Sequence, residues 1–160
     1  MTKKTLKNKK QPVFIFAYGS LVNNSSRKRT LKKHVKAYPT IISKKFGYKK
    51  AYNTIATRNK NEIVMGIEKN KNYSTYIRGA IFSVNKDQQK KLQKREFVYN
   101  PIKIPKKYIN TNLELPKNAK VFTFKPKKTL KKFSKEKKIH VKYANIIQSG
   151  MSKLFGKLNK

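Results

Sequence analysis

The sequence FAYGSL, residues 16–21, ends an apolar run that begins at Val13. A short apolar and aromatic run bounded by Gly and Ser is typical of a buried strand that enters a loop. Gly19 permits a positive φ angle and a close approach of a ligand to the backbone. Successive backbone N–H groups in such a loop can point at one carboxylate. The stretch therefore predicts a strand that ends either in an anion-binding loop or in an ordinary turn.

Outward from this stretch, the chain alternates short strands with a few helices. Pro101 lacks a backbone N–H, so the strand that contains it is expected at a sheet edge or a bulge. Residues 105–120 are expected to be irregular. Further strands are expected at 40–43, within 46–53, and at 63–68, 76–84, 99–104 and 121–124. Helices are expected at 27–34, 87–96 and 140–155, the last with Val141, Ala144, Ile147, Met151 and Leu154 along one face.

This order of elements predicts an α+β fold, a small mixed or antiparallel β-barrel flanked by two or three helices. A chain of 160 residues has the size of one ordinary domain. We expect a single domain over residues 12–156, with basic flexible tails at 1–11 and 157–160.

The composition excludes several classes of protein. The chain has no Cys, so it can form neither a disulfide nor a thiolate metal site. Two His and six acidic residues, spread along the chain, suggest no metal cage. No apolar run approaches the roughly 18 residues of a membrane helix. The apolar stretch after the basic N-terminus is too short for a signal peptide. We therefore expect a soluble cytoplasmic protein without a metal.

The charge is extreme, because 42 Lys and Arg face only 6 acidic residues and give a net charge of +36. A field of this sign attracts nucleic acid and acidic proteins, with an affinity that falls as salt rises. We expect loose, non-specific association with such polyanions. The alternative is that an AT-rich genome fills exposed positions with lysine.

Four stretches in a fixed order carry a resemblance to a known family: FAYGSL, then FGYKKAYN, RGAIFSV and LQKREFVY. Together they resemble the gamma-glutamylcyclotransferase-like family, which includes the avirulence-induced-gene-like proteins. The resemblance covers residues 13–104 well and 121–155 loosely, and leaves 105–120 unplaced. It implies a small mixed barrel flanked by helices.

The resemblance also implies an activity and a site. Members of this family cyclise a gamma-glutamyl group to 5-oxoproline and release the attached amine, without a cofactor. Glu96 matches the family's catalytic glutamate, the general acid/base. The loop that holds the substrate's α-carboxylate and the tyrosines near it are matched, in order, by Tyr18, Gly19, Ser20, Leu21, Tyr99 and Tyr143.

Other functions stay open. Glu96 can instead be a helix-end carboxylate paired with Arg95 or a lysine. Many relatives carry an acid shortly before the catalytic glutamate and a base after the following tyrosine, where this chain has Gln93 and Asn100. The alternative is a catalytically degenerate, highly basic interaction protein, associated with nucleic acid, a capsid or a virion, on the same fold.

Overall fold

The computed structural model of the protein describes residues 11–56, 62–129, 138–139 and 141–156. Over these residues the chain forms nine strands and three α-helices, with three short 3₁₀ helices between them. The expected α+β class is confirmed. The strands are divided between two sheets, and no single hydrogen-bonded ring closes among the described residues.

The larger sheet has six strands in the order β6-β8-β1-β5-β2-β7. It is mixed, because β1 runs antiparallel to β5 and parallel to β8, while the other pairs are antiparallel. Its strands in chain order are β1 (Val13–Ala17), β2 (Tyr38–Ile42), β5 (Ile77–Val84), β6 (Tyr99–Lys103), β7 (Ile109–Thr111) and β8 (Lys120–Pro126). The strand with Pro101 lies at an edge, as expected.

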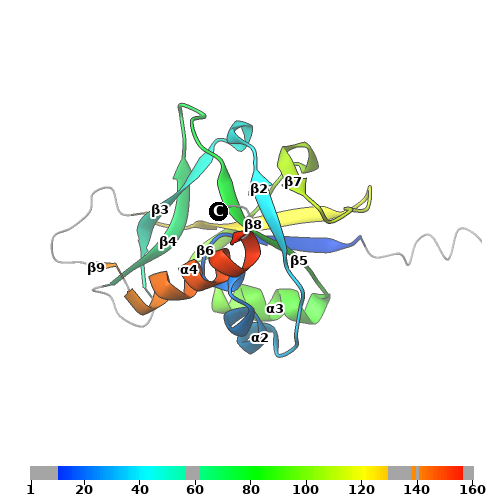
Figure 1. Ribbon diagram of the computed structural model, residues 1–160, viewed down its shortest axis with the longest axis horizontal. Coiled ribbons are helices and arrows are strands. Elements are labelled where there is room, and N and C mark those ends of the chain that lie inside the picture. Colours follow the sequence, from blue (N-terminus) through cyan, green and yellow to red (C-terminus); the bar gives the residue numbers. More distant parts are fainter. Residues whose placement is uncertain (1–10, 57–61, 130–137, 140, 157–160) are drawn as a thin grey trace, which may run out of the picture.

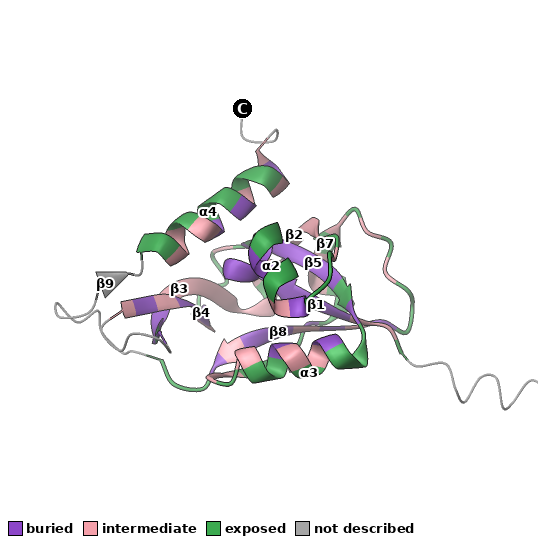
Figure 2. Cartoon of the chain, turned by 90° about the horizontal axis from the view of Figure 1, so that it is seen from below, coloured by how far each residue is buried: buried purple, intermediate pink, exposed green. Residues whose placement is uncertain are grey.

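The core lies around the two central strands of this sheet. Successive residues of a strand point to opposite faces. In β5 the consecutive residues Ala80, Ile81 and Phe82 are all fully buried, so both faces of the sheet are covered there. Figure 2 shows the same burial along the central strands, while the helices expose their outer sides. This explains why β1 is a continuous apolar run and why the segment 80–82 of β5 shows no alternation.

The second sheet has three strands, β3 (Tyr48–Ile55), β4 (Glu62–Lys69) and β9 (Lys138–Ile139). The β3–β4 register shifts between Tyr52 and Thr54, so Asn53 forms a bulge. Gly66 of β4 lets the two sheets approach, because a Cβ atom there would lie 2.5 Å from the ring of Pro126 in β8. β4 contacts β8, so the smaller sheet lies beside the larger one (Figure 1).

Two helices pack against each other beside the larger sheet (Figure 1). α2 (Asn24–Leu31) begins earlier than expected because the Asn23 side chain accepts hydrogen bonds from the first-turn amides. It ends earlier because Lys32 adopts a left-handed conformation. α3 (Lys86–Arg95) agrees with the expectation and starts with a capping box between Asn85 and Gln88.

The C-terminal helix α4 (Val141–Phe155) was expected, but its buried face was predicted wrongly in part. Ile147 is buried as expected, whereas Val141 is 69% exposed. Gly150 and Phe155 are buried instead. A Cβ atom on Gly150 would lie 2.7 Å from the backbone nitrogen of Asn23, so α4 packs closely on the segment after β1. The face of α4 that packs on the rest of the protein therefore includes Gly150, and it differs from the stripe of apolar residues that the sequence predicted.

The expectation that 105–120 is irregular was wrong in part. Residues Lys106–Tyr108 form the 3₁₀ helix η3, and β7 pairs with the edge of β2. A three-residue edge strand leaves no alternating pattern in a sequence, and Thr40 and Thr111 help to hold it by a 3.2 Å hydrogen bond.

The predicted tails lie outside the described residues, except Gln11. The assignment of 12–156 to one domain stays a prediction. No helix in the described part of the chain is long and apolar enough to cross a membrane.

Candidate active site around Glu96

The loop after β1 turns directly into a 3₁₀ helix, η1 (Ser20–Val22). The amide of Val22 donates to the carbonyl of Gly19, and the amide of Asn23 donates to that of Ser20, each at 3.1 Å. Gly19 does not adopt the positive φ angle that a glycine permits, since its φ is −108°. The glycine serves close packing instead: a Cβ atom there would lie 2.7 Å from the Tyr143 hydroxyl.

The buried side chain of Arg27 is hydrogen-bonded to the backbone of this loop. The guanidinium of Arg27, only 4% exposed, donates to the carbonyls of Leu21 at 3.0 Å, Val22 at 3.3 Å and Val35 at 2.8 Å. These carbonyls come from the loop and from the segment after α2. Arg27 thereby fixes the backbone that carries Ser20 and Leu21. Nothing in the sequence distinguishes this arginine from the other cationic residues.

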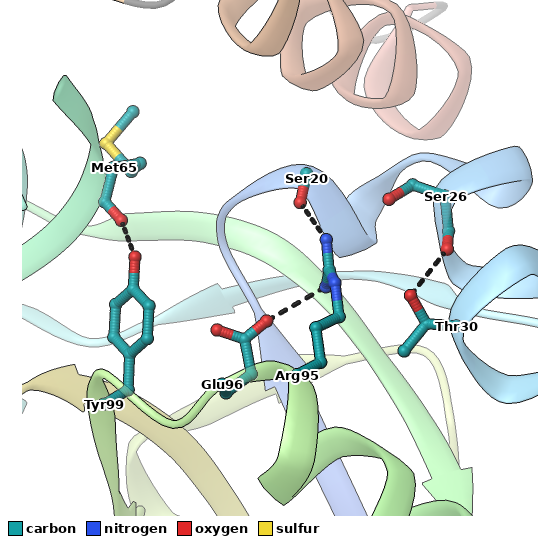
Figure 3. Close-up of polar contacts among 7 residues, drawn as sticks. All are labelled: Ser20, Ser26, Thr30, Met65, Arg95, Glu96 and Tyr99. Atoms are coloured by element: carbon teal, nitrogen blue, oxygen red, sulfur yellow. Dashed lines mark hydrogen bonds and ion pairs between the residues drawn. The ribbon is translucent and has the colours of Figure 1, made fainter. Parts of the chain in front are cut away.

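Glu96 lies at the C-terminal end of α3, where its amide donates to the carbonyl of Leu92 at 2.7 Å. Its carboxylate pairs with Arg95 at 2.9 Å, and the same guanidinium donates to the Ser20 hydroxyl at 2.7 Å (Figure 3). Arg95 therefore links the loop after β1 to a carboxylate 76 residues further along the chain. The pairing with Arg95 expected as one alternative is present, and it lies inside the site.

Three tyrosines approach Glu96 from different elements. The Tyr99 hydroxyl donates to the carbonyl of Met65 at 2.8 Å, opposite the bulge in β3 (Figure 3). The Tyr18 hydroxyl donates to the carbonyl of Phe124 at the end of the parallel strand. Tyr143 comes from α4, which packs on η1. Each ring is thus positioned by a contact between segments that are distant in sequence.

These residues surround a single cavity of about 40 Å³. All seven predicted site residues line it. The lining also includes four residues that were not predicted: Phe16, Ala17, Met65 and Phe124. Phe16 and Ala17 belong to the motif itself, but no sequence signal brings Met65 or Phe124 to it. Gln93 and Asn100 are both exposed and do not line the cavity.

The surroundings make the Glu96 carboxyl easier to protonate. Its side chain is 15% exposed. Burial raises the pKa of Glu96, and the positive charge of Arg95 opposes that rise. Burial also raises the pKa of Tyr18, Tyr99 and Tyr143. The phenols therefore stay neutral at physiological pH. The cavity offers one carboxyl that can exchange a proton, with neutral hydroxyls around it.

A metal has no ligand set in the described residues, where no group of three or more His, Asp or Glu side chains comes together. His34 is exposed, and His140 lies outside the described residues. The cavity itself offers one carboxyl, three phenols and the backbone of the loop after β1.

Solved structures with the same architecture are enzymes and uncharacterised proteins. YkqA from Bacillus subtilis superposes with a TM-score of 0.63 at 15% identity, over 94% of this chain and 52% of YkqA. A gamma-glutamyl cyclotransferase gives 0.61 at 13% identity, over 89% of this chain and 79% of the other. A yeast gamma-glutamyl cyclotransferase specific to glutathione gives 0.61 at 9% identity, over 89% and 88%.

The chain has the gamma-glutamylcyclotransferase-like fold. The resemblance seen in its sequence motifs is confirmed at this level. Sequence identities of 9–15% show a shared fold, and they do not show a shared activity. The chain spans about half the length of YkqA. No protein-family model and no curated protein matches the sequence.

Proposed function

We propose that the protein is a gamma-glutamylcyclotransferase-like enzyme that cyclises a gamma-glutamyl group to 5-oxoproline and releases an amine. In this reaction the α-amine nitrogen attacks the side-chain carbonyl carbon, and the bond from that carbon to the amide nitrogen breaks. The attacking amine loses a proton and the leaving nitrogen gains one. No water or cofactor is consumed.

Glu96 is the group that carries this proton. A single carboxyl between the two nitrogens can accept the proton from one and deliver it to the other. A raised pKa suits this role, because the group then exchanges its proton closer to neutral pH. Arg95 fixes the orientation of the carboxylate through its 2.9 Å ion pair.

The loop Tyr18–Leu21 receives the substrate's α-carboxylate. Successive backbone N–H groups in such a loop can point at one carboxylate. Tyr99 and Tyr143, whose phenols stay neutral, line the same small space. The observation that carries the proposal is that all seven residues, from three segments far apart in the sequence, line one cavity.

The test is the release of 5-oxoproline from gamma-glutamyl amines by wild type and by Glu96→Gln. Removing a general acid/base costs about 10²–10⁴-fold in rate, and the swap is nearly isosteric. The matched control is Glu68→Gln, which removes an equal charge from a glutamate on β4 that is 39% exposed and does not line the cavity. Equal turnover by wild type and Glu96→Gln contradicts the role of Glu96. Absence of turnover by wild type on all gamma-glutamyl compounds contradicts the enzyme.

A second candidate function is a degenerate, basic interaction protein on this fold. It is favoured by the net charge of +36. In the described part of the chain only three ion pairs form, two of them with exposed carboxylates or lysines. Most cations are therefore left to attract polyanions, such as nucleic acid or acidic proteins, in the cytoplasm or inside a virion.

A further inference from the structure

A larger groove of about 740 Å³ lies beside the cavity. The two share four lining residues, which are Ser20, Glu96, Tyr99 and Tyr143. A molecule whose head group occupies the cavity therefore has the groove for the part that extends past Glu96. In the cyclisation reaction that part is the amine that leaves.

The groove is lined by cations from three directions. Its basic residues are Arg29, Lys32, Lys91, Lys94, Arg95 and Lys142, and the acid on its wall is Glu96. They come from α2 and its C-terminal cap, from α3, and from the start of α4. Cations that converge from separate elements can contact one ligand together, whereas a row on one helix would face solvent.

Most of these charges have no partner of opposite sign among the described residues. In the described residues, Lys91 pairs with Asp87 at 3.0 Å and Arg95 pairs with Glu96. The other four, Arg29, Lys32, Lys94 and Lys142, are exposed, and none of them pairs with a described carboxylate. Like charges around one groove repel each other, and an anionic ligand relieves that repulsion.

We propose that the groove selects gamma-glutamyl substrates whose amine half carries two or more carboxylates, with a gamma-linked oligoglutamate as the ligand that fits this chemistry. This rests on the proposed function. The terminal α-amine attacks the first gamma-carbonyl carbon, and the amide bond to the next residue breaks. The proton passes to the freed nitrogen, and 5-oxoproline leaves.

The product of this step is itself a substrate. The freed nitrogen is the α-amine of the next residue, which again carries a gamma-amide. A gamma-linked chain can therefore be shortened one residue at a time from its amino end, while its remaining carboxylates stay among the cations of the groove. A neutral amine half makes no such contacts.

The experiment compares tri-gamma-glutamate with gamma-glutamyl ethylamide, which has a neutral amine half. The groove variant is the double substitution Lys94→Gln/Lys142→Gln. The matched control is Lys71→Gln/Lys117→Gln, which removes the same charge at exposed positions outside the groove. The readouts are kcat/KM for both substrates and calorimetric binding of tri-gamma-glutamate.

The groove variant is expected to lower the preference for tri-gamma-glutamate, as a ratio of kcat/KM values, by roughly 2- to 30-fold, the loss of two exposed ion pairs. Binding of tri-gamma-glutamate should weaken by a similar factor, and the control should change neither. Equal effects of the two variants overturn the proposal while the enzyme stands. Without turnover of any gamma-glutamyl compound the proposed function fails, and the substrate proposal fails with it. Tighter binding of a short oligonucleotide, lost only in the groove variant, also overturns it.

Discussion

Gly19 and Tyr143 meet across the cavity, where a Cβ atom on Gly19 would lie 2.7 Å from the Tyr143 hydroxyl oxygen. The ring carbon that bears this hydroxyl, Cζ, would lie 3.9 Å from the same Cβ atom. The φ angle of Gly19 lies in the ordinary negative range, so an added side chain is opposed by the hydroxyl and not by a left-handed backbone. The glycine in the motif is therefore explained by a side chain from the other end of the sequence.

Gly19→Ala is expected to lower the free energy of unfolding by about 1–3 kcal/mol, the usual cost of overpacking. It should also displace Tyr143 and reduce 5-oxoproline release, because small displacements in a site cost up to about 10²-fold in rate. Urea denaturation measures the first effect. In a Tyr143→Phe background the hydroxyl is gone, so the same glycine substitution should cost much less stability. An equal cost in both backgrounds contradicts the contact.

Arg95→Gln is expected to move the acid limb of the kcat/KM profile to higher pH. The general base must be deprotonated, so activity rises as pH passes the pKa of Glu96. Burial raises that pKa and Arg95 lowers it, so removing the guanidinium leaves the raising effect alone. Ser20→Ala is the control, because it removes the other partner of Arg95 but keeps the charge beside Glu96. If the acid limb of the kcat/KM profile lies at the same pH in Arg95→Gln as in wild type, a group other than Glu96 produces that limb.

The stability of wild type relative to Glu96→Gln is expected to fall as pH rises above about 4.3, the ordinary pKa of glutamate. A carboxyl with a raised pKa in the folded state binds more protons folded than unfolded. Its contribution is therefore complete below the unfolded pKa and is lost as pH rises through the folded pKa. Denaturation of both proteins in parallel cancels the titration of all other groups. A difference that is constant between pH 4 and 7 contradicts the raised pKa.

Arg27→Leu is expected to destabilise the protein by about 1–3 kcal/mol, because it leaves buried carbonyls of Leu21 and Val22 without their donor. Since the same loop lines the cavity, catalytic activity should fall as well. Arg29→Leu, at an exposed position on the same helix, should change the free energy of unfolding by no more than about 0.5 kcal/mol. Equal unfolding midpoints for the two variants would contradict the role of Arg27.

The strands and helices that bury a regular apolar face were predictable. β1 is a continuous apolar run and β5 contains the apolar segment 80–82, while α3 has both a capping residue and a helical period. β7 was missed because three residues at an edge carry no period, and they are held by pairing with β2. The buried face of α4 was misplaced because Gly150 packs by being small, which a search for apolar residues overlooks.

The site was predictable only through its motifs. The loop at 18–21 and Glu96 stand in stretches that resemble one family, and the structure brings them to one cavity. Met65 lines the cavity because β4 lies against the end of β8. The bulge at Asn53 and the closeness of Gly66 to Pro126 bring the two strands together. Such contacts depend on the relative position of two sheets, which local sequence does not encode. Arg27 differs from the other cations only in being buried.

The net charge predicts binding to polyanions without nucleotide-sequence specificity, independent of whether the cavity is catalytically active. Such binding is driven by the release of counterions, so the affinity for DNA should fall by about 10³–10⁵-fold between roughly 50 and 200 mM salt if 6–10 phosphates are contacted. Phosphate contacts carry no base readout, so two unrelated duplexes should bind equally. Fluorescence anisotropy at several salt concentrations measures both, with an acidic protein as a third ligand. A flat salt response would mean that the lysines reflect composition alone, and a strong preference for one duplex would reveal a specific reader. Binding confined to the acidic protein would favour a role in assembly, because the cations would then neutralise protein neighbours and not nucleic acid.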